Sequence, residues 1–286
     1  MAGVPTNRTN ITLPPEVSAE ILAKTQEASA VMSLARQIAL PGRGVSIPVI
    51  TADPEAAWVG ETEAKAVANP ALATKVMEPY KLAVIVPFSN EFRRDAAALY
   101  DELVRRLPLA LAAKFDATVV GAVQAPGSNF DTFAAATAQN ISNPNTYSSL
   151  VAADADIATN GGLMNGIALA PQGKSVLLGA VDGDGRPLFI NNVSEGAVPM
   201  VLGAKTALNK GIYDSSNNVV GIAGDWSQAM YGTVEGVVID YSSDATLKSG
   251  NTEINLFQQN MFAVRAEIEI GFRADVNCFN RLTVTP

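Results

Sequence analysis

Apolar and charged side chains alternate strictly near the end of the chain. Between residues 264 and 272 the apolar positions are Val264, Ala266, Ile268, Ile270 and Phe272, and the charged ones between them are Arg265, Glu267 and Glu269. A period of two is typical of a long strand with one buried face and one face in water. A second strand is predicted at Lys81–Val86, which holds the apolar run Leu82–Val86. We expect these two strands to pair.

The most regular helical pattern lies in residues 89–123. Leucine or phenylalanine recurs at positions 99, 103, 107, 111 and 115, which places one apolar stripe along a long helix. Ser89 or Asn90 is predicted to cap its start, and Pro126-Gly127 to end the element. Pro108 lies inside the pattern and cannot donate a backbone hydrogen bond. We therefore predict a bend there, or a join between two helices.

The first part of the chain is rich in proline. Nine of the 16 prolines fall before residue 90, and this density favours extended chain over long helices. Residues 1–13 are predicted to form an arm that reaches away from the body. Two adjacent prolines can then open a short helix over Glu16–Ala23. A second short helix is expected over Ser29–Ala39, ended by Pro41-Gly42.

A long excursion separates a predicted strand at Val45–Ile50 from the strand at Lys81–Val86. The 30 residues Thr51–Tyr80 are poor in large apolar side chains, the main ones being Trp58, Val59, Leu72, Val76 and Met77. An insertion of this length without its own core cannot stand alone in water. It is either disordered or a long hairpin that lies on a neighbouring molecule, and we favour the hairpin.

Glycine dominates the chain beyond Asn143-Pro144. Fourteen of the 22 glycines fall between residues 161 and 236, which predicts a turn-rich lobe of mixed structure. Helices are expected around residues 147–157 and at Gln172–Leu178, and strands at Gly166–Ala170, Val198–Leu202, Val219–Ala223, Gln228–Val234 and Val237–Tyr241. Because the strands on either side of this lobe are predicted to pair, it would be inserted within the first lobe.

Composition narrows the class of protein. Hydrophobic residues make up 48% and charged residues 17%, which excludes an intrinsically disordered chain. No apolar run is long enough to cross a bilayer, and the start does not resemble a signal peptide, so we expect a cytosol-like compartment and no membrane. With 20 basic and 28 acidic residues the net charge is −8. A chain of this charge that lives beside DNA would enclose it without binding it.

Candidate chemical motifs are incomplete. The chain has no histidine and a single cysteine, Cys278, so the commonest general base, an intrachain disulfide and a thiolate metal cluster are excluded. Gly173-Lys174-Ser175 lacks the first glycine of a phosphate loop at the required spacing. Asp182–Gly185 begins like a calcium loop but lacks its later ligands, and Gly224–Ser227 is not a nucleophile elbow. We predict no catalytic, cofactor or metal site.

Two arginine pairs, Arg93-Arg94 and Arg105-Arg106, lie on the predicted long helix. Their acidic neighbours nearly neutralise them: Glu91, Asp95, Asp101 and Glu102. A solvated face, or one that forms ion pairs between subunits, is therefore favoured over a nucleic-acid site.

Several segments resemble the major capsid proteins of tailed bacteriophages, which have the Johnson fold (the Hong Kong 97 type). They are Ala57–Glu61 (AWVGE), Tyr80–Glu91 (YKLAVIVPFSNE), Gly224–Ser227 (GDWS), Asn255–Ala266 (NLFQQNMFAVRA) and the closing Gly271–Arg273. These segments stand in the order of the family and span about residue 30 to the end of the chain.

The resemblance implies an α+β fold divided as in that family. Its parts would be an N-terminal arm (1–48), an extended E-loop (49–80), a peripheral domain with the long spine helix (81–145 and 246–286) and an inserted axial domain (146–245). It implies a protein without enzymatic activity or cofactor that assembles into hexamers and pentamers. These would form the icosahedral head of a virion around double-stranded DNA, built in the host bacterial cytoplasm. A separate scaffolding protein and a portal are expected partners, and a decoration protein is left open.

Contacts between subunits are expected at Trp58, Glu61, Lys65, Arg93 and Arg94. Some family members also join an E-loop lysine to an asparagine of a neighbour, and Lys65 or Lys75 with Asn277 or Asn280 would be the candidates. Nothing in the sequence marks an apolar pocket that would lower a lysine pKa, so we do not favour this crosslink.

Two other functions are weighed against the phage shell. An encapsulin, a cellular compartment with the same fold that stores a cargo enzyme, is the alternative, and genomic neighbours would separate the two. A carboxylate-based hydrolase is disfavoured because the sequence places no pair of acidic residues for it.

Overall fold

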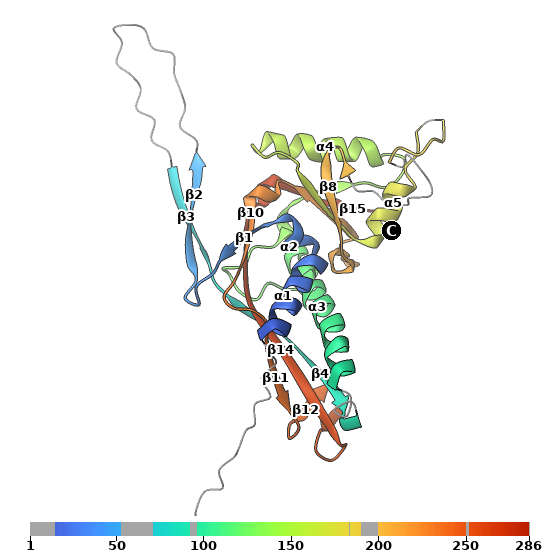
Figure 1. The fold of residues 1–286 in the computed structure, drawn as a ribbon. Coiled ribbons are helices and arrows are strands. Elements are labelled where there is room, and N and C mark those ends of the chain that lie inside the picture. Colours follow the sequence, from blue (N-terminus) through green and yellow to red (C-terminus); the bar gives the residue numbers. More distant parts are fainter. Residues whose placement is uncertain are drawn as a thin grey trace, which may run out of the picture.

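The computed structural model describes residues 15–52, 71–91, 96–182, 184–189, 200–249 and 252–285. Two larger sheets and the helices packed on them form an elongated body (Figure 1). The described residues also contain two hairpins of two strands each. One pairs β2 (Val45–Ala52) with β3 (Ala71–Met77) and leaves the body on one side, and the other pairs β12 (Thr246–Ser249) with β13 (Thr252–Asn255). The helices in the described residues are α1 (Pro15–Ala28), α2 (Ala30–Leu34), α3 (Ala96–Val120), α4 (Thr146–Thr159) and α5 (Pro171–Leu178). The chain therefore has the mixed helix-and-strand composition that the sequence predicts.

A five-stranded sheet runs down one end of the molecule. Its strands are β1 (Arg36–Ala39), β4 (Tyr80–Ser89), β10 (Ala229–Thr233), β11 (Val238–Ser242) and β14 (Met261–Ala274). The long β14 is central, with antiparallel β4 along one edge and antiparallel β10 and β11 in succession along the other. Leu82 lies opposite Ile268 and Val86 opposite Val264. The predicted pairing of these two segments is confirmed.

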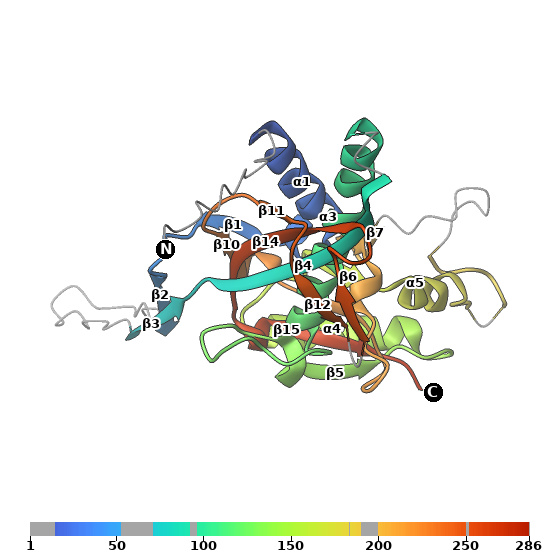
Figure 2. The ribbon, with the colours of Figure 1, turned by 90° about the horizontal axis from the view of Figure 1, so that it is seen from below.

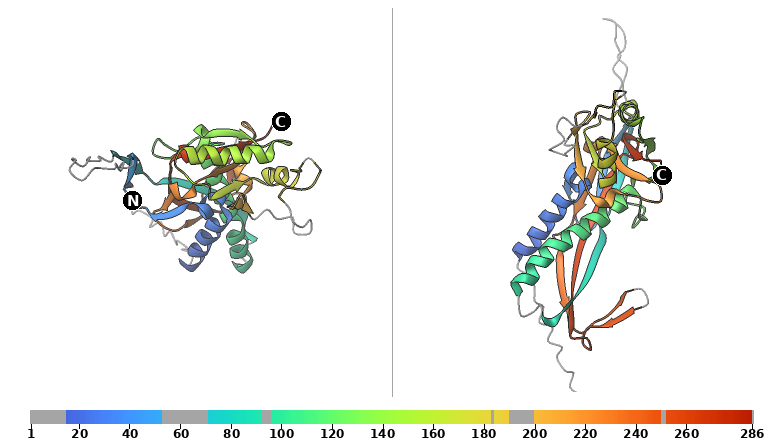
Figure 3. Two further views of the ribbon diagram at one scale, coloured as in Figure 1. Left: turned by 90° about the horizontal axis from the view of Figure 1, so that it is seen from above. Right: turned by 90° about the vertical axis from the view of Figure 1, so that its right-hand side faces the viewer.

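Helices α1 and α3 cover one face of this sheet. They lie side by side (Figure 3, right), and Ile21, Leu107 and Leu111 pack with the alternate apolar residues Val264, Ala266 and Ile268 of β14. Burial of this stripe stabilises α3 although Pro108 lies inside it. The helix runs continuously through Pro108, so the predicted join between two helices is wrong.

The predicted cap of the long helix stays a prediction, although Oγ of Ser89 accepts from the N–H of Glu91 at 3.4 Å. Ser89 is the last residue of β4 and pairs with Met261, and the side-chain amide of Asn90 donates to Oδ1 of Asn260 at 2.7 Å. Because β4 pairs with β14 as far as Ser89, the strand reaches the residue that the sequence places at the start of the helix. The helix begins at Ala96 in the described residues, and residues 92–95 lie outside them.

The second sheet forms the other end of the body. Its six strands, in spatial order, are β5 (Thr137–Asn140), β15 (Phe279–Thr283), β9 (Val219–Gly224), β6 (Gly166–Leu169), β8 (Ala204–Leu208) and β7 (Met200–Val201). Leu150 and Ile157 of α4 and Leu177 of α5 pack against one face, on Ile167 and Leu282. Both helices and the strands β6, β7 and β9 agree with the predicted elements.

Each of the two sheets contains strands from both of the expected domains, the axial range 146–245 and the peripheral ranges 81–145 and 246–286. β10 and β11, which fall within 146–245, pair with β14 in the five-stranded sheet. In turn β5 and β15, from the flanking ranges 81–145 and 246–286, join the six-stranded sheet. Residues 146–245 and the flanking ranges therefore share both sheets, and strand pairing connects them as one body.

An aromatic cluster joins the sheets where they meet. The ring centroid of Phe133 lies 4.5 Å from Phe279 of β15, 5.7 Å from Phe272 of β14 and 5.9 Å from Trp226. Aromatic contacts at these distances add to the free energy gained by burial. The cluster makes the two sheets parts of one body, which Figure 2 shows from below.

The second predicted helix is only partly correct. Helix α2 ends at Leu34, and Arg36–Ala39 forms β1, parallel to β10 with Ile38 opposite Gly232. The apolar spacing of this segment suits either structure, and the open edge of β10 decides between them by supplying hydrogen-bond partners for the backbone. The first helix is longer than predicted, since α1 continues to Ala28.

A buried carboxylate ties α2 to α3. Asp116 of α3 is fully buried, and its oxygens accept hydrogen bonds from Oγ of Ser29 (2.5 Å) and from the backbone N–H groups of Ala30 (2.9 Å) and Val31 (3.4 Å). Burial raises the pKa of Asp116 to about 7, although these hydrogen bonds lower it. These hydrogen bonds hold the start of α2 against α3.

Candidate functional site

The feature that sets this molecule apart from a self-contained globule is its projecting hairpin. β2 (Val45–Ala52) pairs in antiparallel fashion with β3 (Ala71–Met77), with Val45 opposite Met77 and Ile50 opposite Leu72. Within the described residues β2 pairs with β3 alone, and these two strands, the hairpin stem, lead away from the body (Figure 1). A two-stranded ribbon is at best marginally stable in water. The predicted hairpin is confirmed as far as its stem.

Met77 anchors the foot of the hairpin, residues 75–80. Its side chain is fully buried between two glycines that face each other in the five-stranded sheet, Gly232 of β10 and Gly271 of β14. A Cβ atom on Gly271 would lie 2.7 Å from Cγ of Met77 and 2.7 Å from the carbonyl oxygen of Glu78. The absence of side chains at these two positions therefore forms the slot that Met77 fills.

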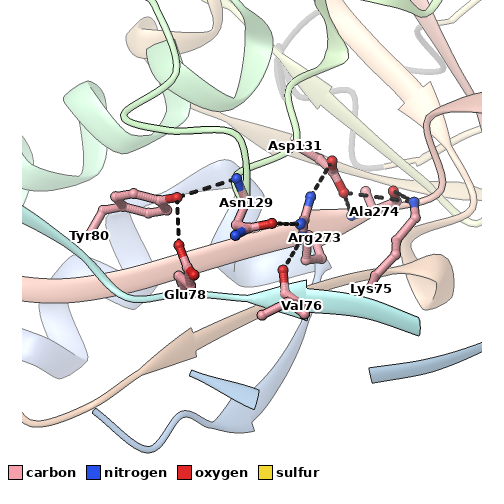
Figure 4. Close-up of polar contacts among 8 residues, drawn as sticks. All are labelled: Lys75, Val76, Glu78, Tyr80, Asn129, Asp131, Arg273 and Ala274. Atoms are coloured by element: carbon pink, nitrogen blue, oxygen red, sulfur yellow. Dashed lines mark hydrogen bonds and ion pairs between the residues drawn. The ribbon is translucent and has the colours of Figure 1, made fainter. Parts of the chain in front are cut away.

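Arg273 holds the foot from the other side (Figure 4). Its Nε donates to the carbonyl oxygen of Val76 at 2.7 Å, Nη1 to Oδ1 of Asp131 at 2.8 Å, and Nη2 to Oδ1 of Asn129 at 2.7 Å. Oδ2 of Asp131 accepts from the N–H of Ala274 at 3.1 Å. Arg273 is only 8% exposed. One guanidinium therefore joins β3, β14 and the loop before Phe133.

Two further polar contacts surround this arginine. Nζ of Lys75 donates to the carbonyl oxygen of Ala274 at 2.9 Å and lies 3.8 Å from Oδ2 of Asp131. The hydroxyl of Tyr80 donates to Oε2 of Glu78 at 3.3 Å and accepts from the N–H of Asn129 at 3.3 Å. The cluster carries two basic and two acidic side chains. Its charges balance, as partly buried charges must.

This arrangement is suited to holding the foot of the hairpin against the body. The polar groups of the cluster described above bond one another or nearby backbone, and Lys75 and Arg273 also line a small cavity of about 50 Å³. Across the described ranges, no three acidic, cysteine or histidine side chains gather as metal ligands would. In the same part of the chain no helix is long and apolar enough to span a membrane.

The predicted contact residues lie outside the part of the chain that the structure describes. Trp58, Glu61 and Lys65 belong to residues 53–70, and Arg93 and Arg94 to residues 92–95. The structure does not test their role. Arg105 and Arg106 of α3 are exposed.

The crosslink candidates are placed in part. Lys75 is engaged in the foot of its own subunit, and Asn280 is fully buried, its amide donating to the carbonyl oxygen of Ala153 at 3.0 Å. A lysine from a neighbour cannot reach a buried amide without unfolding β15. Asn277 is exposed, and Lys65 lies outside the described residues.

The motifs examined for chemistry have structural roles. Gly173 lies in α5, where a Cβ would be 2.5 Å from the carbonyl oxygen of Val220, so its role is close packing. Oδ1 of Asp182 accepts from the N–H groups of Asp184 and Arg186, as in a tight turn. Asp225 caps a short 3₁₀ turn, accepting from the N–H and Oγ of Ser227.

Sequence reasoning missed the anchoring residues of the foot. The alternation in β14 places Arg273 on the same face as Arg265, which is exposed, and so predicts a solvated arginine. The foot of the hairpin covers this face of β14 near the end of the strand, and it buries Arg273 there. Gly271-Phe272-Arg273 is part of the family resemblance, and this signal could have pointed to the anchor.

In the described residues a β-ribbon leaves the body and is attached to it at its foot, which suits a class of protein whose subunits are completed by assembly. The comparisons agree with this class. The phage capsid family model matches residues 9–275 of the chain. A probable major capsid protein of Mycobacterium phage L5 is 30% identical over 95% of this chain and 89% of its own length. The major capsid protein of Staphylococcus phage 80alpha is 25% identical over 95% of this chain and 84% of its own.

The chain belongs to the phage capsid family. Its fold is shared with solved structures of phage proteins. A chain from Microbacterium phage Oxtober96 superposes with a TM-score of 0.72 at 20% identity, covering all of this chain and 96% of the other. One from Mycobacterium phage Adephagia gives 0.71 at 19% identity and 91% coverage of both chains.

Proposed function

We propose that this chain is the major shell subunit of a tailed-phage head, acting without a catalytic step. It would assemble into hexamers and pentamers that close an icosahedral shell around double-stranded DNA. The observation that carries this is the projecting hairpin, which is anchored at its foot by Met77 and Arg273 and leads away from its own body. The names of the relatives, major capsid proteins of phages, support the same role.

The physical argument is one of shared burial. Trp58 and Val59 are the large apolar side chains of residues 53–70, and their burial by another molecule would stabilise the assembly. In a closed lattice each subunit covers a neighbour and is itself covered, so many weak contacts add up to a stable shell. Trp58, Glu61, Lys65, Arg93 and Arg94 are our candidates for these contacts.

The family's division of the chain is part of this proposal. Residues 1–48 would be the N-terminal arm, 49–80 the E-loop, 81–145 with 246–286 the peripheral domain, and 146–245 the axial domain around the hexamer or pentamer axis. The two sheets share strands across these boundaries. Peripheral and axial parts would therefore move together as one body, with the E-loop pivoting at its foot.

The partners follow from the same role. A separate scaffolding protein and a portal would take part in assembly, which would occur in the host bacterial cytoplasm. A decoration protein would be optional. The assembled subunit would reside in the virion. An encapsulin shell is disfavoured because the relatives named above come from phages.

Removal of the hairpin tests the proposal. Ile47 and Lys75 face each other where the stem leaves the foot, so an Asn-Gly turn can replace residues 48–74, keep the strand ends in register and leave the foot intact. The purified full-length chain is expected to form shells in negative-stain images, and the shortened chain to remain a folded monomer with the far-UV circular dichroism of the body. A full-length chain that stays monomeric at high concentration in light scattering would contradict the proposed function.

A further inference from the structure

Helix α1 is attached to α3 by a row of side chains with little apolar surface. The two helices lie side by side (Figure 3, right), and Ile21, Thr25 and Ser29, just beyond the end of α1, follow α3 from Leu107 to Asp116. All three are fully buried. Only Ile21 is apolar, and the hydroxyl of Thr25 donates to the carbonyl oxygen of Ile21 within its own helix at 2.7 Å. Apolar burial therefore contributes little to this row for its length.

The contact with Asp116 closes the end of this row. Asp116 is fully buried and is bonded to Ser29, Ala30 and Val31. Ser29 separates α1 from α2 and has an extended backbone, with φ −82° and ψ 125°. Beyond it, Val31 and Met32 pack in the aromatic core. The core therefore fixes α2, whereas α1 can turn about Ser29.

We propose that Asp116 is a proton-operated latch for α1. The helix lies on α3 while Asp116 carries a proton, and it swings away from α3 about Ser29 when that proton passes to water. The amide of Asn209, which donates to the carbonyl oxygen of Ala28 at 2.6 Å, holds the pivot in place. The inference concerns a single subunit and does not depend on the proposed function.

The hydrogen bonds of the closed form accommodate the protonated carboxyl. With the proton on Oδ1, Asp116 donates to Oγ of Ser29, 2.5 Å away, and Oδ2 still accepts from the N–H of Ala30 at 2.9 Å. Without the proton, a full negative charge is buried away from water, which is costly unless a cation lies beside it. Swinging α1 aside admits water to this charge. The closed form therefore favours the proton, and the open form favours the anion.

The charged side chains on the elements around Asp116 are exposed to water and do not supply that cation. Helix α2, strand β6 and the 3₁₀ turn η2 (Phe133–Ala135) contain none. Among the side chains that the structure describes, the others are Glu20, Lys24 and Glu27 on α1, Arg105, Arg106 and Lys114 on α3, Lys81 on β4, Lys205 on β8, and Lys210 on the 3₁₀ turn η3 (Lys210–Ile212). Burial raises the pKa of Asp116, and its hydrogen bonds, not a charged neighbour, lower it.

The pH range of the latch follows from the pKa of Asp116 in its two forms. Once α1 has swung away, the hydrated carboxyl has its ordinary pKa of 3.8, against about 7 in the closed form. Between these values opening releases one proton, so each pH unit shifts the balance toward the open form by up to about tenfold. Below about pH 4 both forms hold the proton and above about pH 7 neither does, so the balance no longer changes with pH.

Amide hydrogen exchange tests the latch. Wild type and Asp116→Asn are compared at the same pH, from pH 5 to pH 8, so that the chemical rate of exchange cancels. The variant can donate to Ser29 and accept from Ala30 as the protonated carboxyl does, but it cannot ionise. Exchange in residues 20–29 of wild type is expected to rise relative to the variant by up to about tenfold per pH unit, and to level off above about pH 7.

Helix α5, which contains no acidic side chain, is the control within the chain, and Asp244→Asn, which removes an exposed carboxylate, is the control variant. Exchange of α1 in Asp244→Asn should follow wild type at every pH. A constant ratio of wild type to Asp116→Asn, or an equal rise in α5, would overturn the latch. If Asp116→Asn does not fold, the ratio of α1 to α5 within wild type gives the same reading.

Infrared spectra detect the proton itself. The difference between wild type and Asp116→Asn at about pH 5.5 is expected to contain the C=O band of a protonated carboxyl, because exposed carboxyls are ionised at that pH. The band should vanish as the pH rises through about 7, and the difference between wild type and Asp244→Asn should lack it. A wild-type chain without this band would hold an anion in the closed form, and the latch would have to be rejected.

Discussion

At the scale of single residues, Arg273 donates three hydrogen bonds that hold the hairpin foot. Replacing Arg273 by Ala leaves Asp131 without its guanidinium partner and the carbonyl of Val76 without its donor. Breaking a buried, hydrogen-bonded ion pair costs about 3 kcal/mol or more. We expect a loss of this size in the free energy of unfolding, measured by urea titration at a concentration where the chain is monomeric.

Arg265→Ala is the matched control for that experiment. Arg265 lies on the same strand and pairs with Asp240, but the two side chains are 46% and 50% exposed. Exposed ion pairs contribute under about 1 kcal/mol. Equal losses for Arg265→Ala and Arg273→Ala would show that the foot is not held by the buried cluster.

Asp116 makes stability depend on pH. Burial raises its pKa from 3.8 to about 7, so between these values the folded chain holds a proton that the unfolded chain has released. The free energy of unfolding is therefore highest below about pH 4 for this group, and its contribution is lost as the pH rises through about 7. Asp116→Asn cannot ionise and should lack this slope.

Urea titrations of both chains between pH 4 and pH 8 measure this difference. The advantage of wild type over Asp116→Asn is expected to shrink as the pH rises. An advantage that is constant or grows with pH would mean that the hydrogen bonds from Ser29, Ala30 and Val31 outweigh desolvation and keep the carboxylate ionised.

At the scale of elements, the attachment of β3 depends on the slot between β10 and β14. Gly271→Ala places a Cβ 2.7 Å from Cγ of Met77 and from the carbonyl of Glu78. Overpacking of this kind costs about 1–3 kcal/mol. We expect that loss together with faster amide exchange in β3. Combining the change with Met77→Ala should reduce its cost, since one of the two clashes disappears.

Gly179→Ala serves as the control for this change. A Cβ at Gly179 meets its nearest neighbour, the carbonyl oxygen of Ser175, at 3.4 Å, which is ordinary contact. It should leave both stability and the exchange of β3 nearly unchanged. A Gly271→Ala chain as stable as Gly179→Ala would show that the slot can widen freely.

The elements that sequence predicts well are those whose pattern is local. β14 alternates apolar and charged residues over its length, and α3 repeats an apolar residue every fourth position, so both are predicted from periodicity. β1 is not, because its backbone partners lie on β10, almost two hundred residues later. The same holds at the site. The shortage of apolar residues in 51–80 predicts a hairpin, but burial of Met77 and Arg273 depends on distant strands.

At the scale of the whole molecule, the charge balance predicts how the shell treats its contents. A protein that grips DNA releases counterions by placing basic side chains on the phosphates, and its affinity is greatest at low salt. This chain has 20 basic and 28 acidic residues, so the sum of its charges opposes such contacts. We therefore expect the purified chain to cause no retardation of linear duplex DNA in a gel at about 50 mM salt, where non-specific binding is strongest.

Retardation that disappears as salt is raised would contradict this expectation, and the chain offers a way to locate its source. Residues 1–14 contain Arg8 and no acidic side chain, so they are the first candidate for a local basic contact. If a chain that begins at Pro15 no longer retarded DNA, residues 1–14 would bind the DNA while the rest of the chain repelled it. If retardation persisted without residues 1–14, a basic surface elsewhere on the chain would be responsible, and a shell that merely encloses its DNA would have to be abandoned.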